Sequence, residues 1–398
     1  MSYLTIIAYM AFAYLAWASL YQFIFSLASL FPEKKRATIK HTTRKIAVFI
    51  PCYKEDAVIV SVAQAALQQS YSSEDYDVIV IADSLQEETL YHLNQLAIKV
   101  IPVSFENSTK SKALNQTLDQ LTDSYEMAVI LDADNIMAND FLERMNQRFN
   151  EGSIVVQGRR VAKNYDTPMA ILDAASEDIN NYILCKGHQI LGFSVRLAGS
   201  AMAFDYISFK KVMASVKAVG GFDKELELKF TQAGIQLDYD HNAYVYDEKV
   251  RKPAHLTRQR SRWIAAQFHY AKQYLPKGFK ALLLEGRIDF FNKSIQMALP
   301  PRIFLPVLLF TFTIISFLIG STTFTLLWGS ALGVNILSFL IATPSFYFRK
   351  HWKAVFFGLP IAFFSSFKAL LKVGKANKNF IHTPHTYVDF NAKPQKIK

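Results

Sequence analysis

The feature that most constrains this chain is its first stretch, residues 3–31, which carries no charged side chain over 29 positions. As a helix of about 1.5 Å per residue it would be roughly 43 Å long, more than the ~30 Å apolar core of a bilayer. Positive residues follow it, in PEKKR (32–36) and at Arg44 and Lys45. A cleaved signal peptide has a shorter apolar region after a basic start. We therefore predict an uncleaved membrane anchor over 1–36.

A second apolar region lies near the C-terminus. Residues 303–320 and 322–348 are uncharged and long enough to span, and the basic cluster at 349–353 favours the cytoplasmic side. Residues 354–371 are broken by Gly-Leu-Pro and contain a lysine, so they could span, lie in the interface or re-enter. A third full crossing would place the basic tail (372–398) outside, so we expect 354–371 not to cross completely.

The segment between the apolar regions has the pattern of an α/β domain. Near-continuous apolar strands separated by polar, helix-compatible stretches predict a mostly parallel sheet covered on both faces. The predicted strands are 45–50, 77–82, 98–103, 127–132 and 154–158. Residues 276–300 mix apolar with basic side chains, which is typical of an interfacial helix. The expected organisation is an anchor (1–36), a cytoplasmic domain (37–275), an interfacial helix (276–300), membrane segments (301–371) and a basic tail (372–398).

The composition narrows the possible functions. Hydrophobic residues make up 51% of the chain and charged ones 19%, which excludes a disordered chain. Two cysteines exclude a disulfide scaffold and any cysteine-cluster metal site. The net charge of +11 suits nucleic acid, an anionic membrane surface or phosphorylated ligands. We find no recognised nucleic-acid motif, and acidic strand ends repel phosphates unless a metal intervenes.

Acidic side chains follow three predicted strands. Glu55 comes shortly after the first strand, Asp83 after the second, and Asp132 and Asp134 after the fourth. Ligands of parallel sheets bind beyond the carboxyl ends of the strands. Alternate residues of an extended segment point the same way, so Asp132 and Asp134 can converge on Mg²⁺ or Mn²⁺ with a nucleotide, although an Asx-turn is the alternative.

Two acidic and two basic residues are candidates for contacts with a bound nucleotide. Asp83 and Glu55 could accept hydrogen bonds from a base or ribose, while the alternatives are a turn residue and a solvated loop carboxylate. Lys110 and Lys112 lie past the third strand, where a phosphate would need a counter-charge, and we favour Lys112. A basic loop facing solvent is the alternative.

A helix is predicted from the Gly-Gly turn at 220–221 to Gln232, with Gly234 as its stop. Asp223 and Glu227 share one face of it. A carboxylate there could accept a proton from an attacking hydroxyl, and we favour Asp223 with Glu227 as the fallback. An N-cap role for Asp223 is the alternative.

A second helix is predicted over 255–274. It carries Gln259 and Trp263 four residues apart, and Arg262 beside them. Arginine with tryptophan suits a diphosphate and the apolar face of a sugar. A basic amphipathic helix resting on lipid headgroups is the alternative.

Taken in order, FIPCYKE, IADS, LDADN, a carboxylate at a helix start and QRSRW resemble the signature of family 2 inverting glycosyltransferases. The likeness covers about residues 45–270. It is nearest to the membrane-integrated branch that includes cellulose, chitin and hyaluronan synthases and ceramide glucosyltransferase. The resemblance implies a GT-A-like, Rossmann-type sheet domain inserted between membrane helices. It also implies a nucleotide-sugar donor, with a UDP-sugar as the expected one, Mg²⁺ or Mn²⁺, and a saccharide or lipid-linked acceptor.

The resemblance also implies roles for single residues. The nucleotide side is Tyr53, Glu55, Asp83, Lys112, Asp132 and Arg262, with Asp132 and Asp134 at the metal. Asp223 would be the base, and the acceptor side is Gly199, Ser200, Gln259 and Trp263. The segment FIHTPH (380–385) is similar to a gating segment that folds back over the nucleotide. One departure is Phe222, where the family usually has Glu before the catalytic Asp.

Two other classes fit less well. A non-enzymatic membrane-anchored nucleotide- or nucleic-acid-binding protein would explain the positive charge but not the acidic strand ends. A transporter would explain the apolar segments but not the α/β domain between them. Cys52 and Cys185 are expected to be small buried residues.

Overall fold

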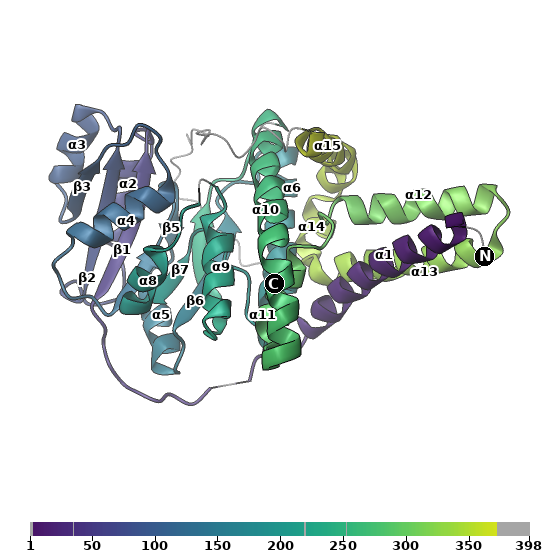
Figure 1. The fold of residues 1–398 in the computed structure, drawn as a ribbon. Helices are drawn as coiled ribbons and strands as arrows, with labels where there is room; N and C mark the ends of the chain where they lie inside the picture. Colours follow the sequence, from purple (N-terminus) through teal and green to yellow (C-terminus); the bar gives the residue numbers. More distant parts are fainter. Residues whose placement is uncertain (1–2, 35, 219, 252, 372–398) are drawn as a thin grey trace.

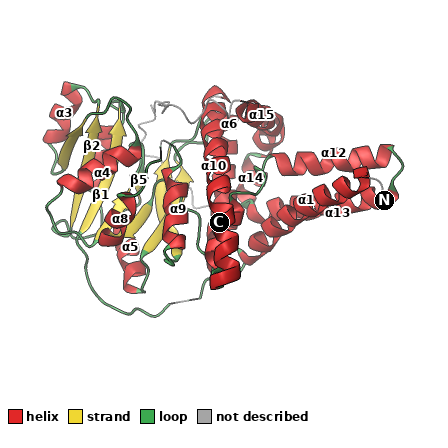
Figure 2. Cartoon of the chain, viewed as in Figure 1, coloured by secondary structure: helices red, strands yellow, loops and turns green. Residues whose placement is uncertain are grey.

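The computed structural model describes residues 3–34, 36–218, 220–251 and 253–371. The basic tail and the predicted gating segment FIHTPH lie outside the described residues. In the view of Figures 1 and 2, a sheet with flanking helices is joined to a set of apolar helices that extends away from it.

The sheet has eight strands in the spatial order β3-β2-β1-β4-β7-β6-β8-β5. The pairs β3/β2, β2/β1, β1/β4 and β6/β8 are parallel, whereas β4/β7, β7/β6 and β8/β5 are antiparallel. The strands are β1 (Ile46–Tyr53), β2 (Tyr76–Asp83), β3 (Lys99–Val103), β4 (Met127–Ile130), β5 (Ile136–Met137), β6 (Val155–Ala162), β7 (Met202–Asp205) and β8 (Leu237–Asp247). The sheet is therefore mixed and mostly parallel, as predicted.

Helices cover the sheet and continue past it. Those of the α/β domain are α2 (Ile59–Ala66), α3 (Glu87–Asn94), α4 (Lys110–Gln120), α5 (Phe141–Asn150), α6 (Pro168–Asn180), the π-helix η1 (Asn181–Gly187), α7 (His188–Ile190), α8 (Tyr206–Met213) and α9 (Phe222–Gln232). The others are α1 (Tyr3–Ala28), α10 (Pro253–Glu285), α11 (Ile288–Gln296), α12 (Phe304–Leu318), α13 (Thr322–Ala342), α14 (Ser345–Lys350) and α15 (Trp352–Leu371).

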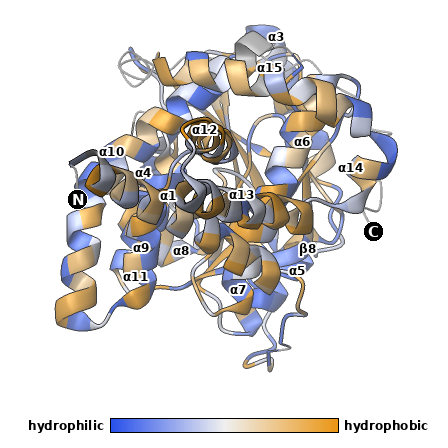
Figure 3. Ribbon diagram, turned by 90° about the vertical axis from the view of Figure 1, so that its right-hand side faces the viewer, coloured by the Kyte–Doolittle hydropathy of each residue, from blue (hydrophilic) through white to orange (hydrophobic). Residues whose placement is uncertain are grey.

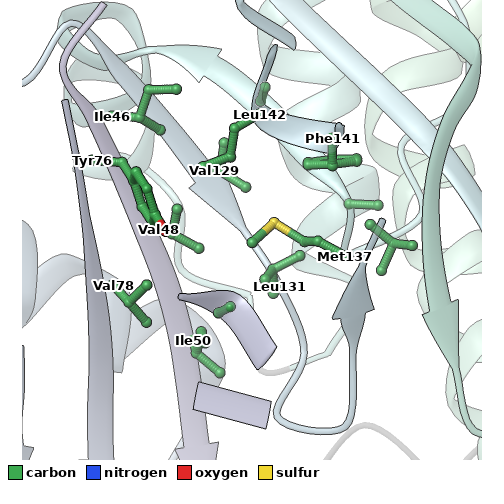
Figure 4. Packing of buried hydrophobic residues seen from close by; sticks show 14 of the residues in the cluster. Ile46, Val48, Ile50, Tyr76, Val78, Val129, Leu131, Met137, Phe141 and Leu142 are labelled. Carbon is green, nitrogen blue, oxygen red and sulfur yellow. The ribbon is translucent and has the colours of Figure 1, made fainter. Parts of the chain in front are cut away.

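The central strands are apolar at successive positions because both of their faces are buried. On β1, Ile46, Val48 and Ile50 join one hydrophobic cluster, drawn in Figure 4, while Ala47 and Phe49 join the cluster on the other face. All five side chains are fully buried. The side-chain period of two along a strand explains this alternation. Continuous apolar runs therefore correctly indicated a sheet covered by helices on both sides.

Two apolar helices form a hairpin, and a third apolar helix packs against it. Helices α12 and α13 are joined by a tight turn at Gly320, and α1 packs along α13, so that the three project from the α/β domain (Figure 1). Figure 3 shows this group nearly end-on, with largely hydrophobic ribbons. By length and composition α1, α13 and α15 are candidate membrane spans. With 15 residues, α12 would reach only about 22 Å.

A layer of helices lies between the sheet and this group. In the views of Figures 1 and 3, α10 and α15 run across the direction of α12 and α13 rather than along it. Helix α15 packs on α10 and α6. The predicted domain boundary after residue 275 falls inside α10, and the stretch 276–300 holds the end of α10 and all of α11.

The N-terminal helix α1 touches the α/β domain directly. A methyl group placed on Gly187, at the end of η1, would collide with the carbonyl oxygen of Phe25 on α1. Past α1, Glu33 pairs with Arg148 at 2.7 Å and Arg36 pairs with Asp238 at 2.7 Å. The basic flank is thus partly paired with carboxylates of the domain.

Candidate functional site

The ends of β1 and β2 meet at one edge of the sheet. Their last residues, Tyr53 and Asp83, are register partners, and the N–H of Lys54 donates to the carbonyl oxygen of Asp83 at 3.2 Å. Lys54 and Ser84 have left-handed backbones, with φ of 55° and 59°. Non-glycine residues in this region cost on the order of 1–3 kcal/mol and cluster at functional sites. Asp83 and Glu55 are both buried beside this edge.

Lys110 connects the end of β4 with two other elements. Strands β2 and β4 flank β1 in the sheet. Lys110 is the first residue of α4, and its Nζ donates to Oδ1 of Asp132 at 2.5 Å and to the carbonyl oxygen of Gly199 at 2.8 Å. The same ammonium lies 5.1 Å from the centroid of the Phe222 ring. Helices α4 and α9, the end of β4 and the loop at Gly199 therefore converge.

Asp134 is buried beneath this edge. Its Oδ2 accepts from the N–H of Glu248 at 2.8 Å, and its Oδ1 accepts from the side-chain amide of Asn135 at 3.0 Å. The Lys163 ammonium donates to its carbonyl oxygen. Burial lowers the pKa of Lys163.

Asp132 and Asp134 are the candidate metal ligands of this site. Within the described ranges no group of three or more His, Cys, Asp and Glu side chains could hold a metal ion. The Asp132 side chain is 39% exposed, whereas Asp134 is 4% exposed. Magnesium sites at phosphates use one or two carboxylates and take other ligands from the phosphates. Asp132 and Asp134 therefore fit an ion that arrives with a diphosphate, rather than a cage made by the protein alone.

The loop before β7 is held by side chains from β6. The N–H of Ala198 donates to Oε1 of Gln157 at 2.8 Å, and Nε2 of Gln157 donates to the carbonyl oxygen of Ser200 at 2.9 Å. Nη1 of Arg160 donates to the carbonyl oxygen of Ala198 at 2.7 Å. These contacts fix the backbone on both sides of Gly199.

The same loop adopts an unusual backbone. Gly199 and Ala201 have φ of 85° and 56°. The hydroxyl of Ser200 accepts from the N–H of Asp132 at 3.2 Å and also donates to Oδ1 of Asn135. The predicted acceptor residues Gly199 and Ser200 thus lie directly against the predicted metal-binding loop.

Asp223 lies on the other side of Gly199, in the first turn of α9. A methyl group on Gly199 would lie 3.9 Å from both Cβ and Cγ of Asp223. The fallback residue Glu227 is 1% exposed, and its Oε1 accepts from Nζ of Lys293 at 2.9 Å. Of the two carboxylates, the one of Asp223 borders the site, and the one of Glu227 is held in a buried ion pair.

The predicted residues of α10 face the start of α9. Ala266 packs against Gly221, because a methyl group on that glycine would lie 2.7 Å from Cβ of Ala266. Arg262 and Trp263 precede Ala266 by four and three residues and therefore share its helix face. Trp263 is 42% exposed. Burial lowers the pKa of Arg262, so an anion beside it would stabilise its charged form.

Gln259 lies one further turn back on α10. Its Oε1 is buried, with no hydrogen-bond partner among the described residues. A buried amide oxygen without a donor is costly, so a hydroxyl donated by a ligand would satisfy it.

The two lysines of α4 take different positions. Lys112 donates from Nζ to the carbonyl oxygen of Asn107 at 2.9 Å, in an exposed position, whereas Lys110 reaches Asp132. Sequence reasoning named both and favoured Lys112. It did not single out Gln157, Arg160 or Lys163. Thr109 was the sequence feature that could have distinguished the two lysines. It caps α4 and makes Lys110 the first residue of that helix.

The sequence of this chain is similar to that of a known protein family. The family described as "Glycosyltransferase like family 2" matches residues 43–266, which is more than half of the chain. No curated protein sequence matches the chain.

Solved structures match at low sequence identity. The mannosyltransferase PcManGT from Pyrobaculum calidifontis, in complex with GDP-Man and Mn2+, is similar with a TM-score of 0.58 and 14% identity, covering 94% of this chain and 99% of that one. Glucosyl-3-phosphoglycerate synthase from Mycobacterium tuberculosis, in complex with Mn2+, UDP and phosphoglyceric acid, has a TM-score of 0.36 and 17% identity, covering 52% of this chain and 72% of that one. At such identities the first likeness supports the fold alone.

Proposed function

We propose a specific activity for this chain, which belongs to glycosyltransferase family 2. The proposed reaction moves a sugar from a nucleotide-sugar donor, a UDP-sugar, to a hydroxyl of a saccharide or lipid-linked acceptor. It is inverting and metal-dependent, and it takes place at the cytoplasmic membrane face, in polysaccharide or glycolipid synthesis. The observation that carries the proposal is the contact of Lys110 with both Asp132 and the Gly199 loop, beside Asp223.

The donor would lie over the strand ends. Asp83 and Glu55, beside Tyr53, are placed to accept hydrogen bonds from the nucleoside. The diphosphate would then lie beside the Asp132–Lys110 pair, close to the positive charge that Lys110 supplies. When bound there, Mg²⁺ or Mn²⁺ would be held by Asp132 and Asp134 and would offset the charge of the leaving diphosphate. Mn2+ or Mg2+ accompanies the nucleotide in the similar solved structures.

The acceptor would approach from the side of α9 and α10. Asp223 takes the proton of its hydroxyl as the bond to the sugar forms on the face opposite the leaving diphosphate. Arg262 stabilises negative charge on that diphosphate, and Trp263 packs on a sugar ring. Gln259 offers its buried oxygen to an acceptor hydroxyl. The Gly199–Ser200 backbone forms the floor between donor and acceptor.

Charge and the helix layer support the proposed location. The basic residues Arg349 and Lys350 end α14, next to the candidate span α13, and favour the cytoplasmic side. Helices α10 and α15 lie crosswise between the α/β domain and the apolar helices, so we propose that they rest at the bilayer surface. A cleft there would be open to a lipid-linked acceptor.

The test is incubation of membranes that contain the protein with a panel of radiolabelled nucleotide sugars, followed by sizing of the product. We expect one UDP-sugar to label a saccharide or a lipid. Membranes that transfer no sugar from any nucleotide donor, with or without added divalent metal, would contradict the proposal.

A further inference from the structure

Lys293 on α11 is the only lysine among the largest fully buried side chains of the described part of the chain. Its Nζ lies 2.9 Å from Oε1 of Glu227 and 3.4 Å from Oε1 of Gln296. Burying a charged pair costs several kcal/mol per ion unless geometry and further hydrogen bonds offset it. Hydrophobic packing alone would be satisfied by an uncharged residue, so the pair suggests a role beyond stability.

The second carboxylate oxygen of Glu227 connects the Lys293–Glu227 ion pair to the Gly199 loop. Its Oε2 accepts from the N–H of Leu197 at 3.1 Å, and Leu197 is fully buried. Two residues further on, the carbonyl oxygen of Gly199 accepts from Lys110. The loop is therefore held from the donor side by Lys110 and from the opposite side by Glu227.

Helix α11 is in turn fixed to the membrane helix α1. The hydroxyl of Tyr21 on α1 donates to Oδ1 of Asn292 at 2.8 Å. Tyr21 Oη and Gln296 Nε2 each lie 3.0 Å from Nε2 of His188. The other ring nitrogen of His188 lies 2.8 Å from the carbonyl oxygen of Ile183. All of these side chains are buried, so a polar connection runs from α1 to the helix that bears Lys293.

We propose that Lys293 is a positioning residue for the acceptor: through Glu227 it fixes the backbone at Leu197 and thereby the Gly199–Ser200 floor, in register with α1. The proposal rests on the proposed function and adds a residue to it. Lys293 and Glu227 touch neither the donor nor the acceptor. They act through the loop.

The physical reason is the strained geometry of this loop. Ala201 has a left-handed backbone that persists only where surrounding contacts impose it. Misplacement of a reacting group by about 1 Å can lower the rate ~10²-fold. A loop freed at Leu197 would misplace the acceptor while the donor contacts at β1, β2 and Lys110 stay intact.

Two double variants test the proposal. Glu227→Gln with Lys293→Met removes both charges and keeps an amide oxygen for the Leu197 N–H, whereas Glu227→Leu with Lys293→Met removes that oxygen as well. We would measure donor hydrolysis by water, the KM for the donor, the KM for the acceptor and the unfolding temperature. We expect the Leu variant to raise the acceptor KM about tenfold or more, and the Gln variant to raise it less, with the donor values unchanged.

The outcomes separate the alternatives. Equal acceptor KM values in the wild type and both double variants would overturn the positioning role, as would parallel losses of donor hydrolysis and transfer. Because a buried pair is disrupted, Tyr21→Phe serves as a second, milder variant, and we expect a smaller rise of the acceptor KM alone. An unchanged acceptor KM in Tyr21→Phe would overturn the link to α1. A wild type without any donor turnover would overturn the proposed function itself.

Discussion

The Nζ of Lys110 lies 2.5 Å from Oδ1 of Asp132, although the two residues belong to different elements and are 22 positions apart. The side chains are 20% and 39% exposed, so a ligand can reach the pair. A diphosphate bound at Asp132 would therefore meet an ammonium already in place. Preorganised charge of this kind stabilises developing negative charge without a cost of reorganisation.

Lys110→Met should weaken donor binding and slow transfer. A charge-assisted hydrogen bond contributes about 1.5–3 kcal/mol, so we expect the donor kcat/KM to fall roughly 10- to 100-fold. Steady-state kinetics with the nucleotide sugar measure this. The comparison variant is Lys112→Met, for which we expect a smaller loss, because Lys112 turns to the carbonyl oxygen of Asn107. A larger loss in Lys112→Met would favour the assignment made from sequence.

Asp223→Asn should abolish transfer and leave donor binding nearly intact. The amide cannot take the acceptor proton, and general base catalysis typically supplies about 10²–10⁴-fold. Single-turnover transfer and equilibrium binding of the nucleoside diphosphate measure the two effects separately. Glu225→Gln is a matched control on the same helix, where Glu225 pairs with Lys229. Equal loss of transfer and binding in Asp223→Asn would move the base elsewhere.

Removal of divalent metal should stop turnover. Asp132 and Asp134 are themselves negative and would repel the leaving diphosphate, so a divalent cation between them is needed to offset its charge. Activity should vanish in EDTA and return on addition of excess Mg²⁺ or Mn²⁺. The double variant Asp132→Asn/Asp134→Asn should show no such recovery. Full transfer by the wild type in chelator would refute the metal assignment.

Acid should destabilise the α/β domain through His241. Burial and the charge of Arg159 lower the pKa of His241 to about 2, from an ordinary value of 6.5. Below pH 6.5 the unfolded chain binds a proton that the folded chain does not, so stability falls as the pH drops from 6.5 toward 2. The slope from this group is at most about 1.4 kcal/mol per pH unit.

Unfolding temperatures measured between pH 7.5 and 5 test whether stability falls as the pH is lowered. We expect a shallower loss of stability with acid in His241→Asn than in the wild type. His92→Asn, at an exposed histidine of α3, is the control and should keep the wild-type slope. Identical slopes in all three proteins would rule out His241 as the group responsible.

The sequence predicted most of the strands that are apolar on both faces and missed the strand that buries charged residues. Strands β1, β2, β3, β4 and β6 lie close to the predicted runs. In contrast, β8 contains Asp238 and Asp240, which are buried because Arg36 and Arg144 pair with them. A buried carboxylate reads as a surface residue until its distant partner is known. Strand β5 has only two residues, too few for a pattern, and β7 was missed although it is as long as β4.

The same distinction between local patterns and distant partners holds for the predicted site residues. Candidate residues close to a strand end or on one helix face, such as Asp132 or Trp263, were named from local spacing. Pairs formed by the fold were not, because Lys293 and Glu227 are 66 positions apart and share no local pattern. The side chains that hold the Gly199 loop belong to this second group.

The close approach of Gly187 to Phe25 has one more consequence. The absence of a side chain at a single position lets η1 and α1 touch backbone to backbone. If α1 spans a bilayer, its apolar length sets its depth there, so the sheet edge that bears Asp132 would stand at a constant height above the lipid. Whether the site can reach an embedded acceptor would then depend on how far that molecule protrudes from the bilayer. Lengthening the chain between α1 and the α/β domain would not extend this reach.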